Sequence, residues 1–343
     1  MPDRSDHSEG RGCCGRSPDA ADSDLGGKYV RRRQLKAAIF PPRTPAADER
    51  FADADILPRA VWGVLLDVSP QVLVIRQGSA ERRLVLTADA TAWRGARLEP
   101  AGLTPGDHVV VRTRGGRQAV ADRIWANIGR VTGTIVERAG QRLTVSEGAA
   151  GKRRVVIIPA RAAGRILVRF PNLQPGFLID VIGRRRGDAL EALVPATSQP
   201  TYRADHLPRV PIIGHVPGTI SGSATWHEPA GEPPGLLGTA YPAIDPEEGC
   251  AEAAGGGGGL PGTARLPFLA IGSVLHVRND CTGSSCLLPV TGCAPAAQLF
   301  NDRCVTCETS PRGRVADLTL ASFIALGGEP ELGCFNATVT IGR

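Results

Sequence analysis

The chain has 343 residues, of which 42% are hydrophobic and 22% are charged, and its formal net charge is +6. Its 42 glycines and 28 prolines argue against a helical bundle and for short strands joined by turns. No apolar run approaches the roughly 18 residues of a membrane helix, so we expect no membrane span.

Charge and cysteine divide the chain into two unlike parts. Residues 1–215 hold 34 Lys+Arg against 22 Asp+Glu, a net charge of +12, whereas residues 216–343 hold 6 against 12, a net charge of −6. Seven of the nine cysteines also lie in the second part. Two differently built halves are the simplest interpretation.

Residues 1–58 are polar and lack periodicity, so we expect a disordered basic tail. The apolar stretch at 37–40 is too short for the hydrophobic region of a signal peptide, and no signal peptide is legible. The role of Cys13 and Cys14 in this tail is left open.

An internal repeat follows the tail at a constant offset of 70 residues. The stretches 63–78 and 133–148 align without a gap, and the turn sequence L-x-P-G occurs at 103–106 and again at 173–176. Short β-branched runs broken by turn residues predict small antiparallel barrels. We therefore predict two copies, at 60–128 and 129–198, and a linker at 199–217. The recurring pairs are Gly63/Gly133, Gln71/Gln141, Leu73/Leu143, Gly78/Gly148, Arg83/Arg153 and Val85/Val155.

The two repeats resemble short β-barrel modules found in tandem in bacterial envelope proteins, with an OB-like topology as one possibility. Because OB barrels bind single strands through aromatic side chains in a basic groove, nucleic acid is one alternative partner. We interpret the aromatic residues of the repeats as core or edge packing instead, and we expect no chemistry here. These residues are Trp62, Trp93, Trp125, Phe170 and Phe177.

The last part, from about residue 218, differs from the repeats in composition and in sequence pattern. A strand at 218–229 ends in Trp226 and His227, and the glycine run at 255–259 predicts a flexible loop. The run at 313–328 predicts a strand that delivers Asp317, followed by a helix of about two turns. Asp317 or Thr319 would cap this helix, and Gly327 or Gly328 would end it.

Four short motifs occur here in a characteristic order: "ATW" at 224–226, "LPF" at 266–268, "NDR" at 301–303 and "GRVADLT" at 313–319. This order resembles the double-psi β-barrel of the rare lipoprotein A and expansin families over residues 218–343. The resemblance implies an all-β fold with a six-stranded double-psi barrel and a short helix. It also implies a groove for cell-wall glycan, with peptidoglycan as the expected ligand.

The resemblance places a catalytic acid/base at Asp302 and an acidic groove residue at Asp317. Cleavage of a glycosidic bond requires one group to protonate the leaving oxygen and a second to assist at the oxocarbenium centre. The two aspartates are candidates for these roles. Four further residues are candidates for substrate contacts: Trp226, His227, Asn301 and Arg303.

Three interpretations of function follow. The first is a cell-wall polysaccharide-binding protein with lytic activity; the second is a non-enzymatic, expansin-like wall-binding module; the third is a nucleic-acid-binding protein acting through the repeats. Residues 255–268 lack the histidine of lytic members, and Cys304 replaces the glycine after "NDR". His227 and His276 are the alternatives for that histidine. We expect no cofactor and no metal.

The seven cysteines of the last part predict disulfides in an oxidising compartment, with one thiol left over. They favour an exported protein of the cell envelope or the extracellular space. Zinc is the alternative, but only Cys304 and Cys307 have close ligand spacing. The sequence fixes neither the pairing nor the oligomeric state. The candidates are Cys250, Cys281, Cys286, Cys293, Cys304, Cys307 and Cys334.

Overall fold

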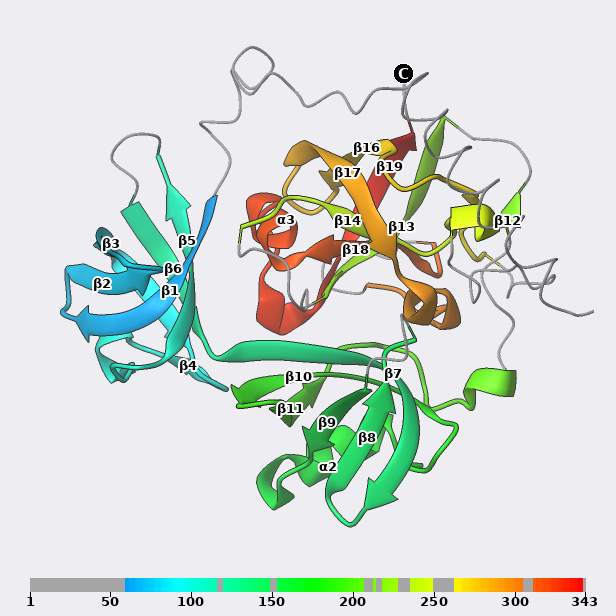
Figure 1. Cartoon of the computed structure of the whole chain (residues 1–343), viewed down its shortest axis with the longest axis horizontal. Helices are drawn as coiled ribbons and strands as arrows, with labels where there is room; N and C mark the ends of the chain where they lie inside the picture. Colours follow the sequence, from blue (N-terminus) through cyan, green and yellow to red (C-terminus); the bar gives the residue numbers. More distant parts are fainter. Residues whose placement is uncertain are drawn as a thin grey trace, which may run out of the picture. The chain divides into compact units, whose positions relative to one another are not determined.

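The computed structural model describes residues 59–115, 120–148, 153–206, 212–213, 218–227, 235–248, 262–304 and 311–341. The predicted tail at 1–58, the glycine-rich loop at 255–259, and Cys13, Cys14, Cys250 and Cys307 lie outside these ranges. The described residues form three β-barrels with two short α-helices, so the all-β prediction is confirmed (Figure 1).

The first barrel is a six-stranded sheet in the order β2-β1-β5-β6-β3-β4, and a further β2–β3 pairing closes five of the strands into a ring. A short 3-10 helix, η2 (Pro100–Gly102), precedes β5. Alternate strand residues such as Leu65, Leu73 and Ile124 fill the interior. The strands are β1 (Arg59–Val68), β2 (Val72–Gln77), β3 (Ala80–Trp93), β4 (Arg97–Leu98), β5 (His108–Arg114) and β6 (Val120–Ala126).

The second barrel is closed in the order β10-β11-β9-β8-β7, and α2 (Ala160–Arg169) connects β9 to β10. In both barrels the five ring strands follow the order 1-2-3-5-4 around the ring, and the third and fifth strands are parallel. This is the topology of an OB fold. The strands are β7 (Ile128–Ala139), β8 (Arg142–Ser146), β9 (Arg153–Ile157), β10 (Leu178–Arg186) and β11 (Ala189–Pro195).

The 70-residue offset extends to strand register. Leu65 pairs with Ile75 immediately before a β-bulge in the first barrel, and Ile135 pairs with Val145 before the same bulge in the second. The L-x-P-G turns are equivalent too. The amides of Gly106 and Gly176 each donate, at 2.8 Å, to the carbonyl of that bulge-flanking residue. Both glycines have positive φ angles, 93° and 88°.

The third strand departs from the predicted offset. Leu73 pairs with Leu84 in the first barrel, whereas Leu143 pairs with Val156 in the second. The offset is therefore 72 in this strand, because the second hairpin is longer by two residues. The sequence pairs Arg83/Arg153 and Val85/Val155 are coincidences of spacing and not equivalent positions.

The recurrence of Gly63 and Gly133 has a steric cause. A Cβ atom at Gly63 would lie 2.7 Å from the carbonyl oxygen of Arg76, and one at Gly133 would lie 2.0 Å from that of Ser146. Both contacts are with the backbone of the paired strand, which cannot move aside easily. Glycine is required at this point of each barrel.

The third barrel is closed in the order β13-β18-β14-β17-β16-β19. Numbered one to six along the chain, these strands lie in the order 1-5-2-4-3-6 around the barrel. Exchanging strand 1 with 4, strand 2 with 5 and strand 3 with 6 leaves every pair of neighbouring strands in place. The two parallel pairs, β13–β18 and β14–β17, exchange with each other in this operation. Two interlocked three-stranded halves of this kind form a double-psi barrel. The strands are β13 (Thr219–His227), β14 (Thr239–Tyr241), β16 (Val274–Asn279), β17 (Ser285–Cys293), β18 (Arg314–Thr319) and β19 (Cys334–Ile341).

The predicted helix is α3 (Leu320–Ala325), and Thr319 is its N-cap. The hydroxyl of Thr319 accepts from the amide of Ser322 at 3.3 Å, so of the two cap candidates the structure selects Thr319. Gly327, with a φ of 78°, follows the helix. The remaining elements are β12 (Ile212–Ile213), β15 (Leu266–Pro267), η4 (Ala204–His206), η5 (Pro246–Glu248), η7 (Pro295–Leu299) and η8 (Pro330–Leu332).

Among the residues that the structure describes, no helix has the length and hydrophobicity needed to cross a membrane.

Candidate functional site

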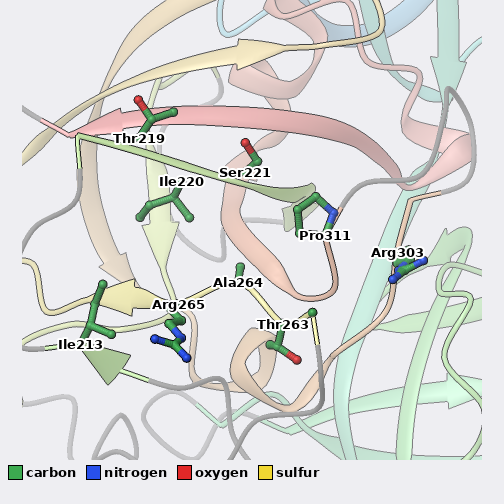
Figure 2. Close-up of a pocket in the computed structure, with 10 residues that line it drawn as sticks. Ile213, Thr219, Ile220, Ser221, Thr263, Ala264, Arg265, Arg303 and Pro311 are labelled. Atoms are coloured by element: carbon green, nitrogen blue, oxygen red, sulfur yellow. The ribbon is translucent and has the colours of Figure 1, made fainter.

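A groove of about 730 Å³ lies on the double-psi barrel (Figure 2). One side is formed by the start of β13, where Thr219 and Ser221 are exposed. The opposite side is formed by the segment 262–265 that leads into β15, together with Arg303. We call this depression the β13 groove. The remaining residues that line it are Ile213, Ile220 and Pro311.

Two arginines give the β13 groove a positive charge. Figure 2 shows Arg265 and Arg303 on either side of Thr263. No carboxylate is found among the described residues that line the groove. The available polar groups are hydroxyls and guanidiniums, which bind a polyhydroxylated or anionic ligand but provide no acid or base for cleavage.

The motif at 301–303 turns its three side chains to different surroundings. Asn301 is buried, and its backbone N–H donates to Oε1 of Gln199 at 2.7 Å. The backbone of Arg303 is fixed by Ser198, whose hydroxyl donates to its carbonyl at 2.9 Å. Only the side chain of Arg303 reaches the β13 groove. The described start of the predicted linker, from residue 199, is thus packed against this motif.

Asp302 belongs to a buried charge network. Its carboxylate accepts from the hydroxyl of Thr197, and Nε and Nη2 of Arg314 each lie 3.3 Å from one of its oxygens. Its side chain is 5% exposed. A carboxylate engaged in this way is not presented to a glycan in this structure.

The network continues from Arg314 into the second OB barrel. Nη2 of Arg314 donates to Asp180 at 2.5 Å, and Nε and Nη2 of Arg130 donate to the same carboxylate at 2.9 and 2.7 Å. Arg130 also donates to the carbonyl of Gly333 at 2.6 Å. Two arginines and two aspartates, none more than 5% exposed, therefore form a buried ion-pair network between the two barrels. Its two positive and two negative charges balance.

The arginines determine the protonation state of Asp180. Burial alone would raise the pKa of this carboxyl, but the charges and hydrogen bonds of Arg130 and Arg314 outweigh it and lower the pKa from 3.8 to about 2. Asp180 is thus ionised at neutral pH. The buried chain of charges has a structural role.

Asp317 lies three residues beyond Arg314 on β18, with different neighbours. Thr225 donates to its Oδ1 at 2.8 Å, and Nδ1 of His227 lies 3.7 Å from its Oδ2. Nδ1 also lies 3.0 Å from the backbone oxygen of Asp317. Because a carbonyl only accepts, Nδ1 is the donor in this contact. The structure brings His227 to Asp317, but among the described residues Asp302 and Asp317 share no hydrogen-bond partner.

Trp226 lies in the core and is 1% exposed. Its Nε1 donates to the carbonyl of Pro330 at 2.9 Å, and the guanidinium of Arg130 lies over its ring at 5.9 Å. A sugar ring cannot stack on an indole with this exposure. His276 is exposed on β16 and lies opposite Thr340 of β19.

The described cysteines divide into bonded and free ones. Cys304 and Cys334 form a disulfide with a Cα–Cα distance of 5.9 Å, and Cys281 and Cys293 are disulfide-bonded as well. Cys286 is a buried free thiol, and burial raises its pKa. In the described ranges, no group of three or more His, Cys, Asp or Glu residues is arranged to hold a metal.

No protein-family model and no curated protein matches the chain.

The sequence motifs do not mark most of the β13 groove, and of the buried network they mark only Asp302. Arg265 stands alone in a loop, and Thr219 and Ser221 are ordinary strand hydroxyls, so no motif marks them. Arg130 and Asp180 lie 122 to 184 residues from Asp302 and Arg314 along the chain. The one available signal was the pair of internal charges in otherwise apolar strands, "IGRVTGTI" and "FLIDVIG", because a charge at a core position needs a buried partner.

Proposed function

We propose that the protein binds a cell-wall polysaccharide, with peptidoglycan as the expected ligand, through the β13 groove of its double-psi barrel, and that it does not cleave this ligand. The observation that carries the proposal is the composition of the groove. It is open and contains hydroxyl and guanidinium groups, without a carboxylate among its described lining residues.

The environment of the candidate catalytic residues supports binding over cleavage. A general acid must give its proton to the leaving oxygen and therefore needs contact with the substrate. Asp302 is buried, and its carboxylate is already engaged by Arg314 and Thr197. Asp317 is half-buried and held by Thr225. Of the functions that the resemblance to rare lipoprotein A and expansins implies, we therefore favour wall binding of the expansin-like, non-enzymatic kind.

Two further observations support this assignment. The disulfide-bonded cysteines favour an oxidising compartment, where a wall polysaccharide would be met. The β2–β3 and β8–β9 faces, by which OB folds bind strands, carry no exposed aromatic side chain. Their single aromatic residue, Trp93, is buried. The nucleic-acid alternative therefore lacks a stacking surface there.

The test is co-sedimentation of the purified full chain with insoluble peptidoglycan sacculi. Ser221→Trp places a large side chain in the β13 groove from an exposed strand position, and we expect it to reduce the bound fraction severalfold. His276→Trp, at an exposed strand position of the same barrel outside the groove, is the matched control and should bind as the wild type does. Equal binding by all three proteins would contradict the groove assignment.

Cleavage is tested on the same sacculi by mass spectrometry of the soluble fraction. The proposal predicts no soluble muropeptides or anhydro fragments above those released by heat-inactivated protein. Fragments released by the wild type and lost in a folded Asp317→Asn variant would establish catalysis and overturn the non-enzymatic assignment.

A further inference from the structure

The arginines of the double-psi barrel differ in whether they are paired with a carboxylate. Arg314 is paired with two aspartates, and Arg278 lies 3.9 Å from Asp280. Neither Arg265 nor Arg303 forms an ion pair with any residue that the structure describes. The Nε atom of Arg303 is also shielded from solvent and has no hydrogen-bond partner in the same ranges. These two positive charges thus have no carboxylate partner within the described ranges.

Both arginines belong to the β13 groove. Arg303 passes beside the turn at Gly262, where a Cβ atom would lie 3.9 Å from its Nη2. Arg265 follows three residues after that turn and is exposed. The aspartate that precedes Arg303 in the chain is paired with Arg314 instead. The described lining of the groove therefore carries positive charge and no carboxylate.

We propose that Arg265 and Arg303 form an anion subsite, and that the β13 groove selects polysaccharides that bear carboxylates along the chain. This inference rests on the proposed function and adds the ligand class to it. A planar guanidinium donates two parallel hydrogen bonds to a carboxylate, a geometry that a neutral sugar hydroxyl does not match. The hydroxyls of Thr219 and Ser221, across the groove, would bind the neutral part of the same chain.

The two arginines should contribute unequally. Arg303 is half-buried, so a carboxylate bound to it is better shielded from water than one bound to the exposed Arg265. We expect Arg303→Gln to weaken binding about 10-fold and Arg265→Gln about 3-fold. Arg278→Gln is the control, because Arg278 is an exposed arginine of the same barrel outside the groove.

The experiment compares sacculi with the same sacculi after carbodiimide amidation, which removes the carboxylate charges and leaves the sugar backbone unchanged. Wild-type protein should bind native sacculi about 10-fold or more tightly than amidated ones, and the preference should shrink at high ionic strength. The double variant Arg265→Gln/Arg303→Gln should bind both forms equally, whereas Arg278→Gln should keep the wild-type preference.

The possible failures can be told apart. If the wild type binds native and amidated sacculi equally, the anion subsite is refuted and the proposed function stands. If the double variant keeps the full preference, the subsite lies elsewhere and the inference is refuted. If the wild type binds neither form, the proposed function itself is refuted. A preference for phosphate-bearing over carboxylate-bearing polysaccharide in a parallel binding assay would overturn the assignment to carboxylates.

Discussion

Replacing Asp180 by asparagine tests the buried charge network that joins the second OB barrel to the double-psi barrel. The substitution preserves the size of the side chain but removes the charge between Arg130 and Arg314. Arg130 then has no carboxylate partner, and Arg314 retains only Asp302. Both arginines remain buried, because each is 1% exposed in the native protein.

Two estimates give the size of the effect. The lowering of the pKa of Asp180 from 3.8 to about 2 corresponds to about 2 kcal/mol of folding free energy at neutral pH. Removing one partner of a buried ion pair costs about 3–5 kcal/mol, because it leaves an uncompensated charge. We therefore expect Asp180→Asn to lower the free energy of unfolding by about 3 kcal/mol.

The assay is native-state hydrogen exchange at the amides of β10 and β18, which reports the free energy of opening in each barrel separately. Glu81→Gln is the control, because Glu81 forms an exposed pair with Arg83 and its loss should cost no more than about 0.5 kcal/mol. A loss of less than about 1 kcal/mol in Asp180→Asn, similar to the control, would refute the assigned role of the network.

The same variant has a defined pH dependence. Because the pKa of Asp180 is lowered in the folded state, its contribution is complete above about pH 4 and is lost as the pH falls towards about 2. The difference in stability between wild type and Asp180→Asn should therefore shrink below pH 4. A difference that stays constant down to pH 2 would contradict this assignment.

Three further substitutions test local features, each by urea denaturation. Gly133→Ala should lower the free energy of unfolding by about 2 kcal/mol or more, because its Cβ would lie 2.0 Å from a backbone oxygen. Its control is Gly164→Ala on α2, which has open space around it and should be neutral or stabilising. Equal effects of the two substitutions would contradict the steric argument. Thr319→Ala should cost about 1 kcal/mol through loss of the α3 cap, and no loss would show that the cap is dispensable. Replacing Cys304 and Cys334 by serine should lower the free energy of unfolding by about 3–4 kcal/mol, because the disulfide closes a 30-residue separation. Replacing the free Cys286 by alanine should lower it much less. The reverse order of effects would contradict the assigned pairing.

The repeat was the most predictable part of the fold, because its signals are local. The L-x-P-G turns and the glycines at 63 and 133 report backbone requirements that any copy of this barrel must meet. In the third strand the 70-residue offset that Arg83 and Val85 suggest differs by two residues from the structural offset, because the length of the preceding hairpin determines the register there.

The site was less predictable, because its properties depend on contacts distant in sequence. The motif "NDR" predicts a site at residues 301–303, but nothing in it shows that Asp302 contacts Thr197 and Arg314 while Arg303 lines the groove. Trp226 ends a strand next to a histidine, a pattern typical of an exposed platform. Its burial follows from η8 and Arg130, which only the folded chain brings over it.

Binding of peptidoglycan in the β13 groove can be tested by hydrogen exchange of the full chain with and without soluble peptidoglycan fragments. We predict slower exchange at residues 219–221, 262–265 and 303, which border the β13 groove, and no change on β2–β3 or β8–β9. Protection confined to those OB-barrel strands, with unchanged exchange around the groove, would contradict the account.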